Sequence, residues 1–295
     1  MSDPHRLVYD RTPSMGLGYL RALSAGGRKL SEGGTIDAIE ATAWKVQPDP
    51  AQVAHYRRIC SIPDGPAVPL AYPHVLAVPL QMAVITCSAF PLPTLGLVHV
   101  AQTIEQLRSI SVGEALRLHV RVQGHRVVRS GVEFDLMTRV ECGGEDVWRA
   151  VTTCLSRGGG TGGKRTGPKP APAQGEEPDR IRSMLWQVPA DMGRRYAAVA
   201  GDWNPIHLWP VTARLFGFKR AIVHGMWSLA RVLAELDDLA SAEQCRVETR
   251  FKRPIMLPAK VLFTASAGDG CTDFAVTSAD GQRLHLDGHV GAIHD

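Results

Sequence analysis

The chain has 295 residues, of which 44% are apolar and 21% charged, and its formal net charge is +4. This size and composition predict a globular protein of two domains with a substantial core. The cationic residues are scattered, which argues against a nucleic-acid partner. No run of about 18 apolar residues suggests a membrane span, and the N-terminus lacks a signal-peptide core, so we expect a cytoplasmic protein.

The six cysteines form no CxxC pair, and several lie in apolar runs. They are expected to be free, buried thiols in a reducing compartment. Histidines and cysteines also do not cluster at metal-ligand spacing, so we expect neither a metal nor a redox cofactor.

Glycine and proline divide the chain into segments. Residues 1–30 predict a loosely held N-terminal arm because they are rich in glycine. Residues 157–180 consist almost entirely of glycine, proline, charged and small residues, and predict a flexible linker. The two remaining segments, 31–156 and 181–295, are the expected domains.

These two segments have similar patterns. Residues 39–46 and 181–188 each alternate like a strand and lead through a polar stretch to a tyrosine in a short helix. Each half also has one longer apolar segment, at 72–87 and at 224–236, that predicts a buried helix. The rest is strand-like, so each half is predicted to be an antiparallel sheet wrapped around one helix, an α+β fold.

The C-terminal half contains a compact group of chemically active residues. Asp202 and His207 lie five residues apart, and the turn residues between them are Asn204 and Pro205. Gly201 permits unusual backbone angles just before them. Such a turn can aim a carboxylate and an imidazole at one point, which suits general acid–base chemistry. The alternative is that Asp202 caps a turn and His207 is structural.

A second signal is the sequence His224-Gly225-Met226 at the expected start of the central helix. The first N–H groups of a helix have no partner within it, and the helix dipole favours negative charge there. Gly225 could therefore donate a hydrogen bond to the oxygen of a thioester carbonyl. The alternative is ordinary packing of a helix start, with His224 in a structural role.

Together these two motifs resemble the MaoC-like dehydratases, a group that includes the (R)-specific enoyl-CoA hydratases, or hydratase 2. The resemblance is carried by Gly-Asp-Trp-Asn-Pro-Ile-His at 201–207 and, about 15 residues later, by Val-His-Gly-Met at 223–226. It extends from residue 181 to the C-terminus. The first half, through residues 69–73 and 96–99, resembles the degenerate partner domain of two-domain members such as the mycobacterial (3R)-hydroxyacyl-thioester dehydratases.

The resemblance implies a double hotdog fold, in which two hotdog domains lie side by side with continuous sheets. It also implies reversible hydration of trans-2-enoyl thioesters, carried by coenzyme A or acyl carrier protein, to (R)-3-hydroxyacyl thioesters. Asp202 and His207 would be the catalytic pair, and the Gly225 N–H would bind the thioester oxygen. Asn204 would orient the pair or the water, with Gly201 and His224 in supporting roles.

The first half departs from the motif. Asp64 has no matching histidine, and Val78-Pro79 is placed where the other half has Gly225-Met226. Since proline has no N–H to donate, one active site per chain is expected. The first half would then be free to accommodate an acyl tail, a role compatible with its small residues Ala77, Ala83 and Ser88.

Two other functions remain open from the sequence: a hotdog acyl-thioesterase, and a non-catalytic subunit that binds acyl thioesters. Four cationic residues could contact the phosphates of the acyl carrier, or could simply face solvent on a strand: Arg246, Arg250, Lys252 and Arg253. Monomer and homodimer are both possible because a double hotdog already contains two hotdog units.

Overall fold

The computed structural model describes residues 5–24, 28, 30–31, 33–94, 96–157 and 180–293. The predicted linker lies almost wholly outside the described residues, between the end of one strand at Arg157 and the start of another at Arg180. The following description concerns the described residues.

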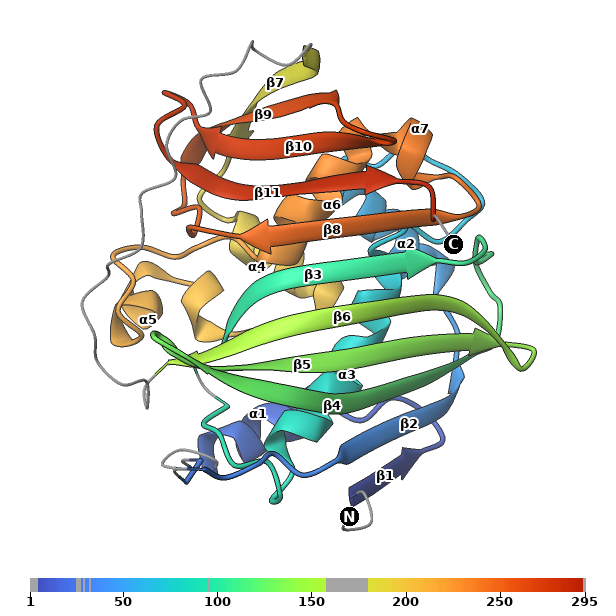
Figure 1. Ribbon diagram of the computed structural model, residues 1–295, viewed down its shortest axis with the longest axis vertical. Helices are drawn as coiled ribbons and strands as arrows, with labels where there is room; N and C mark the ends of the chain where they lie inside the picture. Colours follow the sequence, from blue (N-terminus) through green and yellow to red (C-terminus); the bar gives the residue numbers. More distant parts are fainter. Residues whose placement is uncertain are drawn as a thin grey trace.

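Eleven strands form one continuous sheet in the order β1-β2-β4-β5-β6-β3-β8-β11-β10-β9-β7 (Figure 1). The N-terminal half supplies β1 (His5–Tyr9), β2 (Ile39–Val46), β3 (Val98–Gln106), β4 (Leu116–Val128), β5 (Gly131–Cys142) and β6 (Glu145–Arg157). The C-terminal half supplies β7 (Arg180–Val188), β8 (Cys245–Phe251), β9 (Ala259–Ala267), β10 (Cys271–Ser278) and β11 (Leu284–Gly291). The two halves join where β3 pairs with β8 in antiparallel register, with Thr103 opposite Glu248.

The helices lie against one face of this sheet (Figure 1). In the N-terminal half they are α1 (Met15–Ser24), α2 (Pro50–Cys60) and the central helix α3 (Tyr72–Thr86). In the C-terminal half they are α4 (Met192–Ala200), the 3-10 turn η1 (Pro205–His207), α5 (Pro210–Leu215), the central helix α6 (Gly225–Glu235) and α7 (Asp237–Ala240). In the described part of the chain, no helix is long and apolar enough to cross a lipid bilayer.

The predicted repeat of strand, short helix and central helix is present in both halves: β2, α2 and α3 in the first, and β7, α4 and α6 in the second. The strands alternate as expected; on β4, the side chains of Leu116, Leu118 and Val120 are buried beneath the sheet. One continuous apolar core runs through both halves and includes α3 and α6. Burial of this surface is the main stabilising contribution to the fold.

The N-terminal arm is more ordered than its composition predicts. β1 pairs in parallel with β2, and α1 packs on α3. The two helices approach closely because Gly18 has no side chain: a Cβ there would lie 2.5 Å from Cγ of Met82. The prediction of a loosely held arm is therefore wrong for residues 5–24, because glycine here serves packing.

The predicted correspondence between Val78-Pro79 and Gly225-Met226 is also wrong. α6 does begin at Gly225, but α3 begins at Tyr72, and Pro79 lies inside that helix. Pro79 therefore removes no N–H at the start of α3; the proline in the first turn of that helix is Pro73. The reason to expect one site per chain is then the missing histidine partner of Asp64, which is an exposed loop residue.

Candidate active site

The turn after α4 brings the predicted pair to one place. α4 ends at Ala200 and is capped by Gly201, whose φ of 69° is left-handed and favours glycine. Asn204 then caps η1, since its side chain accepts a hydrogen bond from the N–H of Ile206. Asp202 and His207 lie on either side of this cap, and both line the same cavity.

One oxygen of the Asp202 carboxylate is held by two donors. Oδ1 accepts hydrogen bonds from the Tyr19 hydroxyl at 3.0 Å and from the Asn204 N–H at 3.1 Å. Oδ2 lies 3.7 Å from Nε2 of His224, and the side chain is 34% exposed. Burial favours the neutral acid, but the two histidines and these donors outweigh it, so the pKa of Asp202 is lowered. Asp202 is therefore a carboxylate at neutral pH.

The two buried imidazoles, His207 and His224, stack with ring centroids 3.6 Å apart and planes 25° apart. Nδ1 of His207 donates to the Ile222 carbonyl at 2.8 Å, and Nε2 of His224 donates to the Asp202 carbonyl at 2.9 Å. Burial and the neighbouring ring lower the pKa of His207 to about 3, and burial also lowers that of His224. In its neutral form His207 therefore has an unprotonated Nε2 that can accept a proton.

Asp202, His207 and His224 each offer a ligand atom, and these atoms lie within 4.8 Å of one another. By distance alone they could surround a cation. However, Nε2 of His224, which lies 3.7 Å from Oδ2 of Asp202, already donates its hydrogen to the Asp202 carbonyl and is therefore not a free ligand. Tetrahedral metal sites need converging donors. The arrangement suits proton transfer better than metal binding.

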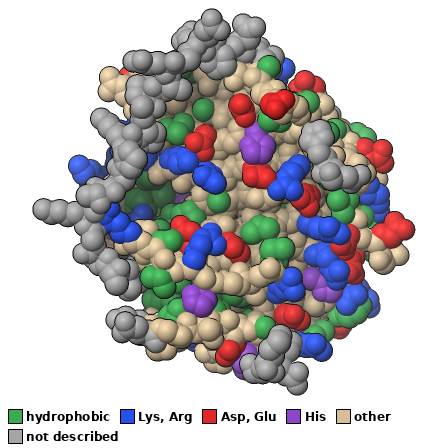
Figure 2. Space-filling view, viewed as in Figure 1, with side chains coloured by type: hydrophobic (Ala, Val, Ile, Leu, Met, Phe, Trp, Pro, Cys, Tyr) green, Lys and Arg blue, Asp and Glu red, His purple; other side chains and the backbone are tan. Residues whose placement is uncertain are grey.

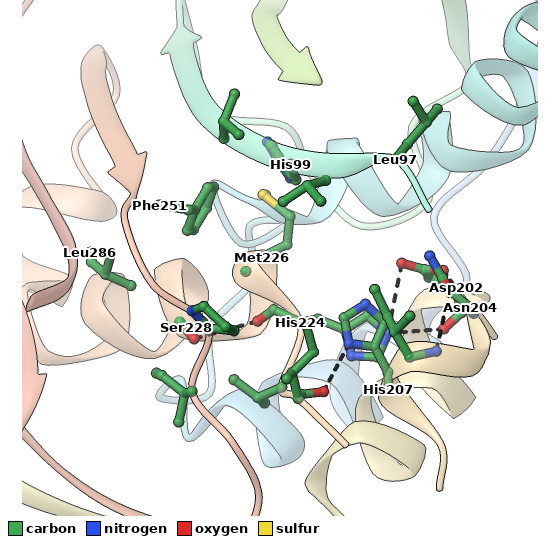
Figure 3. Close-up of a pocket in the computed structure, with 18 of the residues that line it drawn as sticks. Leu97, His99, Asp202, Asn204, His207, His224, Met226, Ser228, Phe251 and Leu286 are labelled. Carbon is green, nitrogen blue, oxygen red and sulfur yellow. Dashed lines mark hydrogen bonds and ion pairs between the residues drawn. The ribbon is translucent and has the colours of Figure 1, made fainter. Parts of the chain in front are cut away.

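The cavity has a volume of about 310 Å³ and lies between the two halves of the chain. Figure 3 shows Asp202 and His207 on one side, with Leu97, His99 and Phe251 across from them. Apolar residues from α3 and β3 complete the wall of the N-terminal half. A partly open, largely apolar cleft with a few polar groups is the usual form of a small-molecule site.

Gly225 lies at the edge of this cavity as the first residue of α6. Its N–H has no carbonyl one turn earlier in the helix to bond, and the helix dipole favours negative charge at this end. A Cβ at Gly225 would lie 3.0 Å from Cε1 of Phe251, so a side chain here would crowd that ring. Gly225 therefore lines the same cavity as Asp202 and His207.

The expected residues of an acyl-tail channel are not those that line the cavity. Ala77 and Ala83 are buried in the core and Ser88 is exposed. The wall of the first half is instead built by larger residues, including Val75 and Val78 of α3. Small residues on a buried helix more often allow close packing than leave open space. That the first half holds an acyl tail stays a prediction.

Two of the four predicted phosphate contacts reach the cavity. Lys252 and Arg253 line it, together with Arg157 of β6, which the sequence had not suggested. Arg246 pairs instead with two glutamates, and Arg250 is exposed on the outer face of the sheet. Figure 2 shows Lys and Arg side chains around an apolar hollow at the left of the molecule.

Sequence reasoning missed four residues at the site: Tyr19, His74, His99 and Gly193. His74 and His99 stack with ring centroids 5.9 Å apart and line the cavity from the first half. A Cβ at Gly193 would lie 2.0 Å from the carbonyl oxygen of His207, so α4 packs directly on the turn that carries Asp202 and His207. Glycine in the first turn of a helix was an available signal; Tyr19, which lies 183 residues from Asp202, had none.

Comparison with known proteins agrees with this geometry. The profile of the MaoC like domain matches residues 169–274. The chain is 37% identical to 3-hydroxyacyl-thioester dehydratase X of Mycobacterium tuberculosis over 249 residues, which cover 83% of this chain and 86% of that protein. The crystal structure of HtdX from the same organism has a TM-score of 0.74 at 33% identity and covers 86% of this chain and 100% of that chain.

The fold predicted from the resemblance is confirmed as well. A conserved hypothetical protein of M. tuberculosis described as a double hotdog has a TM-score of 0.56 and covers 92% of this chain and 99% of that chain; at 14% identity it supports the fold alone. The high identity over most of both chains carries the family assignment. On this evidence, the chain belongs to the MaoC-like dehydratase family and has a double hotdog fold.

Proposed function

We propose that this chain catalyses the reversible addition of water to trans-2-enoyl thioesters, giving (R)-3-hydroxyacyl thioesters in fatty-acid or related acyl metabolism. The observation that supports the proposal is that Asp202, His207 and Gly225 line one cavity. The relative from M. tuberculosis, named a 3-hydroxyacyl-thioester dehydratase, supports the same reaction class.

In this mechanism a single water lies between the catalytic pair. Oδ2 of Asp202 accepts one water hydrogen, and Nε2 of the neutral His207 accepts the other. The water oxygen forms a bond to C3 of the substrate as Asp202 takes its proton, and the electrons of the C2–C3 double bond move toward the thioester carbonyl. A proton from this pair then adds to C2, so the net change is one water added and both residues return to their starting state.

The developing enolate needs a donor at the carbonyl oxygen. The Gly225 N–H provides one from the positive end of α6, where no helical carbonyl competes for it. The apolar wall formed by residues such as Phe251 and Met226 keeps bulk water away from this hydrogen bond. Excluding water strengthens the interaction, because the surrounding dielectric constant is lower.

The acyl carrier, whether coenzyme A or acyl carrier protein, would approach from the cationic side of the cavity. Lys252, Arg253 and Arg157 are placed to meet its phosphates. Lys252 lies 3.3 Å from Asp287, so a phosphate would compete with that carboxylate for it. We further propose that the enzyme is cytoplasmic, because its six cysteines are free. It would act as a monomer or a homodimer.

The thioesterase and the non-catalytic binding subunit remain alternatives. A thioesterase would use a water to attack the carbonyl carbon, and an amide donor at the carbonyl oxygen would serve that reaction as well; the name of the M. tuberculosis relative favours attack at C3. A binding subunit would need no catalytic pair, yet Asp202 is ionised and His207 has a free basic nitrogen. The binding subunit therefore leaves this pair without a role.

The test incubates the purified chain with crotonyl-CoA and with longer enoyl-CoAs. Loss of the enoyl absorbance with formation of the (R)-3-hydroxyacyl product is expected, and release of free thiol without hydration would contradict the proposal. Asp202→Asn and His207→Gln should each lower turnover by about 100-fold or more. Asp64→Asn is the matched control: it makes the same change on an exposed loop of the first half and should leave turnover intact.

A further inference from the structure

We propose that Tyr19, carried by the N-terminal helix α1, is a positioning residue that holds Asp202 in its reactive orientation. This inference rests on the proposed function, in which Asp202 accepts the proton of the attacking water. It also assigns a role to the N-terminal arm, which neither catalytic motif includes.

The two oxygens of the Asp202 carboxylate have different surroundings. Oδ1 accepts from both the Tyr19 hydroxyl and the Asn204 N–H, at 3.0 and 3.1 Å, which saturates its capacity as an acceptor. Oδ2 has His224 Nε2 at 3.7 Å, and the hydrogen of that nitrogen is already given to the Asp202 carbonyl. Oδ2 is therefore the oxygen left for water, and the bond from Tyr19 fixes which oxygen that is.

Tyr19 reaches the site because α1 is docked on both halves. On one side Gly18 packs against Met82 of α3, as its 2.5 Å Cβ approach to Cγ shows. On the other side, a Cβ at Gly201 would lie 3.8 Å from Cγ of Met15. Residues 15, 18 and 19 share one face of a helix because they are three and four positions apart. The same face of α1 thus touches α3, the catalytic turn and Asp202.

The surroundings of the Tyr19 hydroxyl favour its protonated form, which can donate a hydrogen bond. Burial, the charge of Asp202 and the hydrogen bond to it all raise the pKa of Tyr19, while the Trp203 N–H bonded to its oxygen opposes this. The hydroxyl therefore keeps its proton throughout the neutral range. A group that cannot release its proton does not act as a catalytic acid. It stabilises the charged form of Asp202, since a hydrogen bond to a carboxylate favours ionisation.

The test is Tyr19→Phe, which removes one hydroxyl and keeps the ring. Loss of a hydrogen bond to a charged group predicts a fall in kcat of about 10- to 100-fold. KM should change little because Tyr19 is not among the residues that line the cavity. The acid limb of the pH–rate profile should move to higher pH. Tyr9→Phe on β1 is the matched control, with the same atoms removed from the same arm and no expected effect on kcat.

A second measurement separates positioning from simple structural support. In an Asp202→Asn background, Tyr19→Phe should cause almost no further loss, because the carboxylate that it holds is gone. Equal losses in both backgrounds, or a Tyr19→Phe enzyme with unchanged kcat and acid limb, would overturn the inference.

A third measurement needs no turnover. Carbon-13 NMR titration of labelled aspartate carboxyls, assigned with Asp202→Asn, should show a higher pKa for Asp202 in Tyr19→Phe than in the unaltered protein. If the unaltered chain does not hydrate enoyl thioesters, the proposed function fails while this shift still supports the contact. An unchanged Asp202 pKa would refute the role of Tyr19 whatever the reaction proves to be.

Discussion

Gly193→Ala tests whether the position of the catalytic turn, rather than its residue types alone, determines the rate. Gly193 is the second residue of α4 and makes no proposed contact with substrate. A Cβ at this position would lie 2.0 Å from the His207 carbonyl oxygen, whereas real Cβ contacts are essentially never under 3.0 Å. The turn must therefore move by about 1 Å, and displacement on this scale can cost about 100-fold in rate.

The displacement would also strain the hydrogen bonds that fix His207. Its N–H bonds to the Asn204 carbonyl at 3.0 Å, and its Nδ1 bonds to the Ile222 carbonyl at 2.8 Å. Overpacking of this kind typically lowers the free energy of unfolding by about 1–3 kcal/mol. We therefore expect kcat for crotonyl-CoA to fall by about 100-fold, with a lower Tm but a folded protein by circular dichroism.

Gly16→Ala provides a matched control. Gly16 is also the second residue of a helix, α1, but a Cβ there would meet only Oγ of Ser14, at 3.7 Å. The Gly16→Ala enzyme should have unchanged activity. Its free energy of unfolding should be unchanged or slightly higher, because alanine reduces the conformational freedom of the unfolded chain. A Gly193→Ala enzyme with the kcat of the unaltered protein would refute the reasoning, since the turn would then tolerate a shift that the mechanism forbids.

Three further predictions concern the cavity and its histidines. Gly225→Ala should lower kcat/KM about tenfold by crowding Phe251; the double variant with Phe251→Leu should recover part of the loss, and no recovery would argue against steric crowding. Acid should destabilise the fold, because burial lowers the pKa of His74 to about 3, His99 to about 4 and His207 to about 3. Below the ordinary value near 6.5 the unfolded state binds protons that the folded state does not, so each of the three costs about 1.4 kcal/mol per pH unit. Urea midpoints measured at pH 7.5 and 5.5 should therefore differ clearly, and equal midpoints would contradict this. For the same reason kcat/KM should show no histidine inflection between about pH 5 and 8; an inflection near 6.5 that disappears in His207→Gln would show that His207 titrates there and would contradict this prediction.

The fold and the centre of the site were predictable because their signals are local. The strand-to-helix pattern at 39–46 and 181–188 recurs within each half, and α6 begins at Gly225 as its motif predicts. Asp202 and His207 are five residues apart, so one turn brings them together whatever the rest of the chain does. The family resemblance then placed these local signals in the correct fold, which the comparisons confirm.

The residues that the sequence did not reveal depend on contacts between distant segments. Tyr19 meets Asp202 only because α1 docks on α3, and a glycine-rich arm gives no sign of such docking. His99 lines the cavity because β3 pairs with β8, a long-range pairing. One helix boundary was also misplaced: Pro79 looked like the start of a helix but lies inside α3. Local sequence patterns report on residues that are neighbours along the chain, whereas these contacts depend on how distant segments pack against each other.

The pairing of β3 with β8 makes each half of the chain dependent on the other. A C-terminal fragment would keep Asp202 and His207 but lose the Leu97 and His99 side of its cavity, and β8 would become an open edge prone to aggregation. The first half therefore completes the cavity even though the proposed catalytic pair lies in the second half. Substitutions on the inward faces of α3 and β3 should alter substrate preference, whereas substitutions in the loops of the first half should have little effect on it.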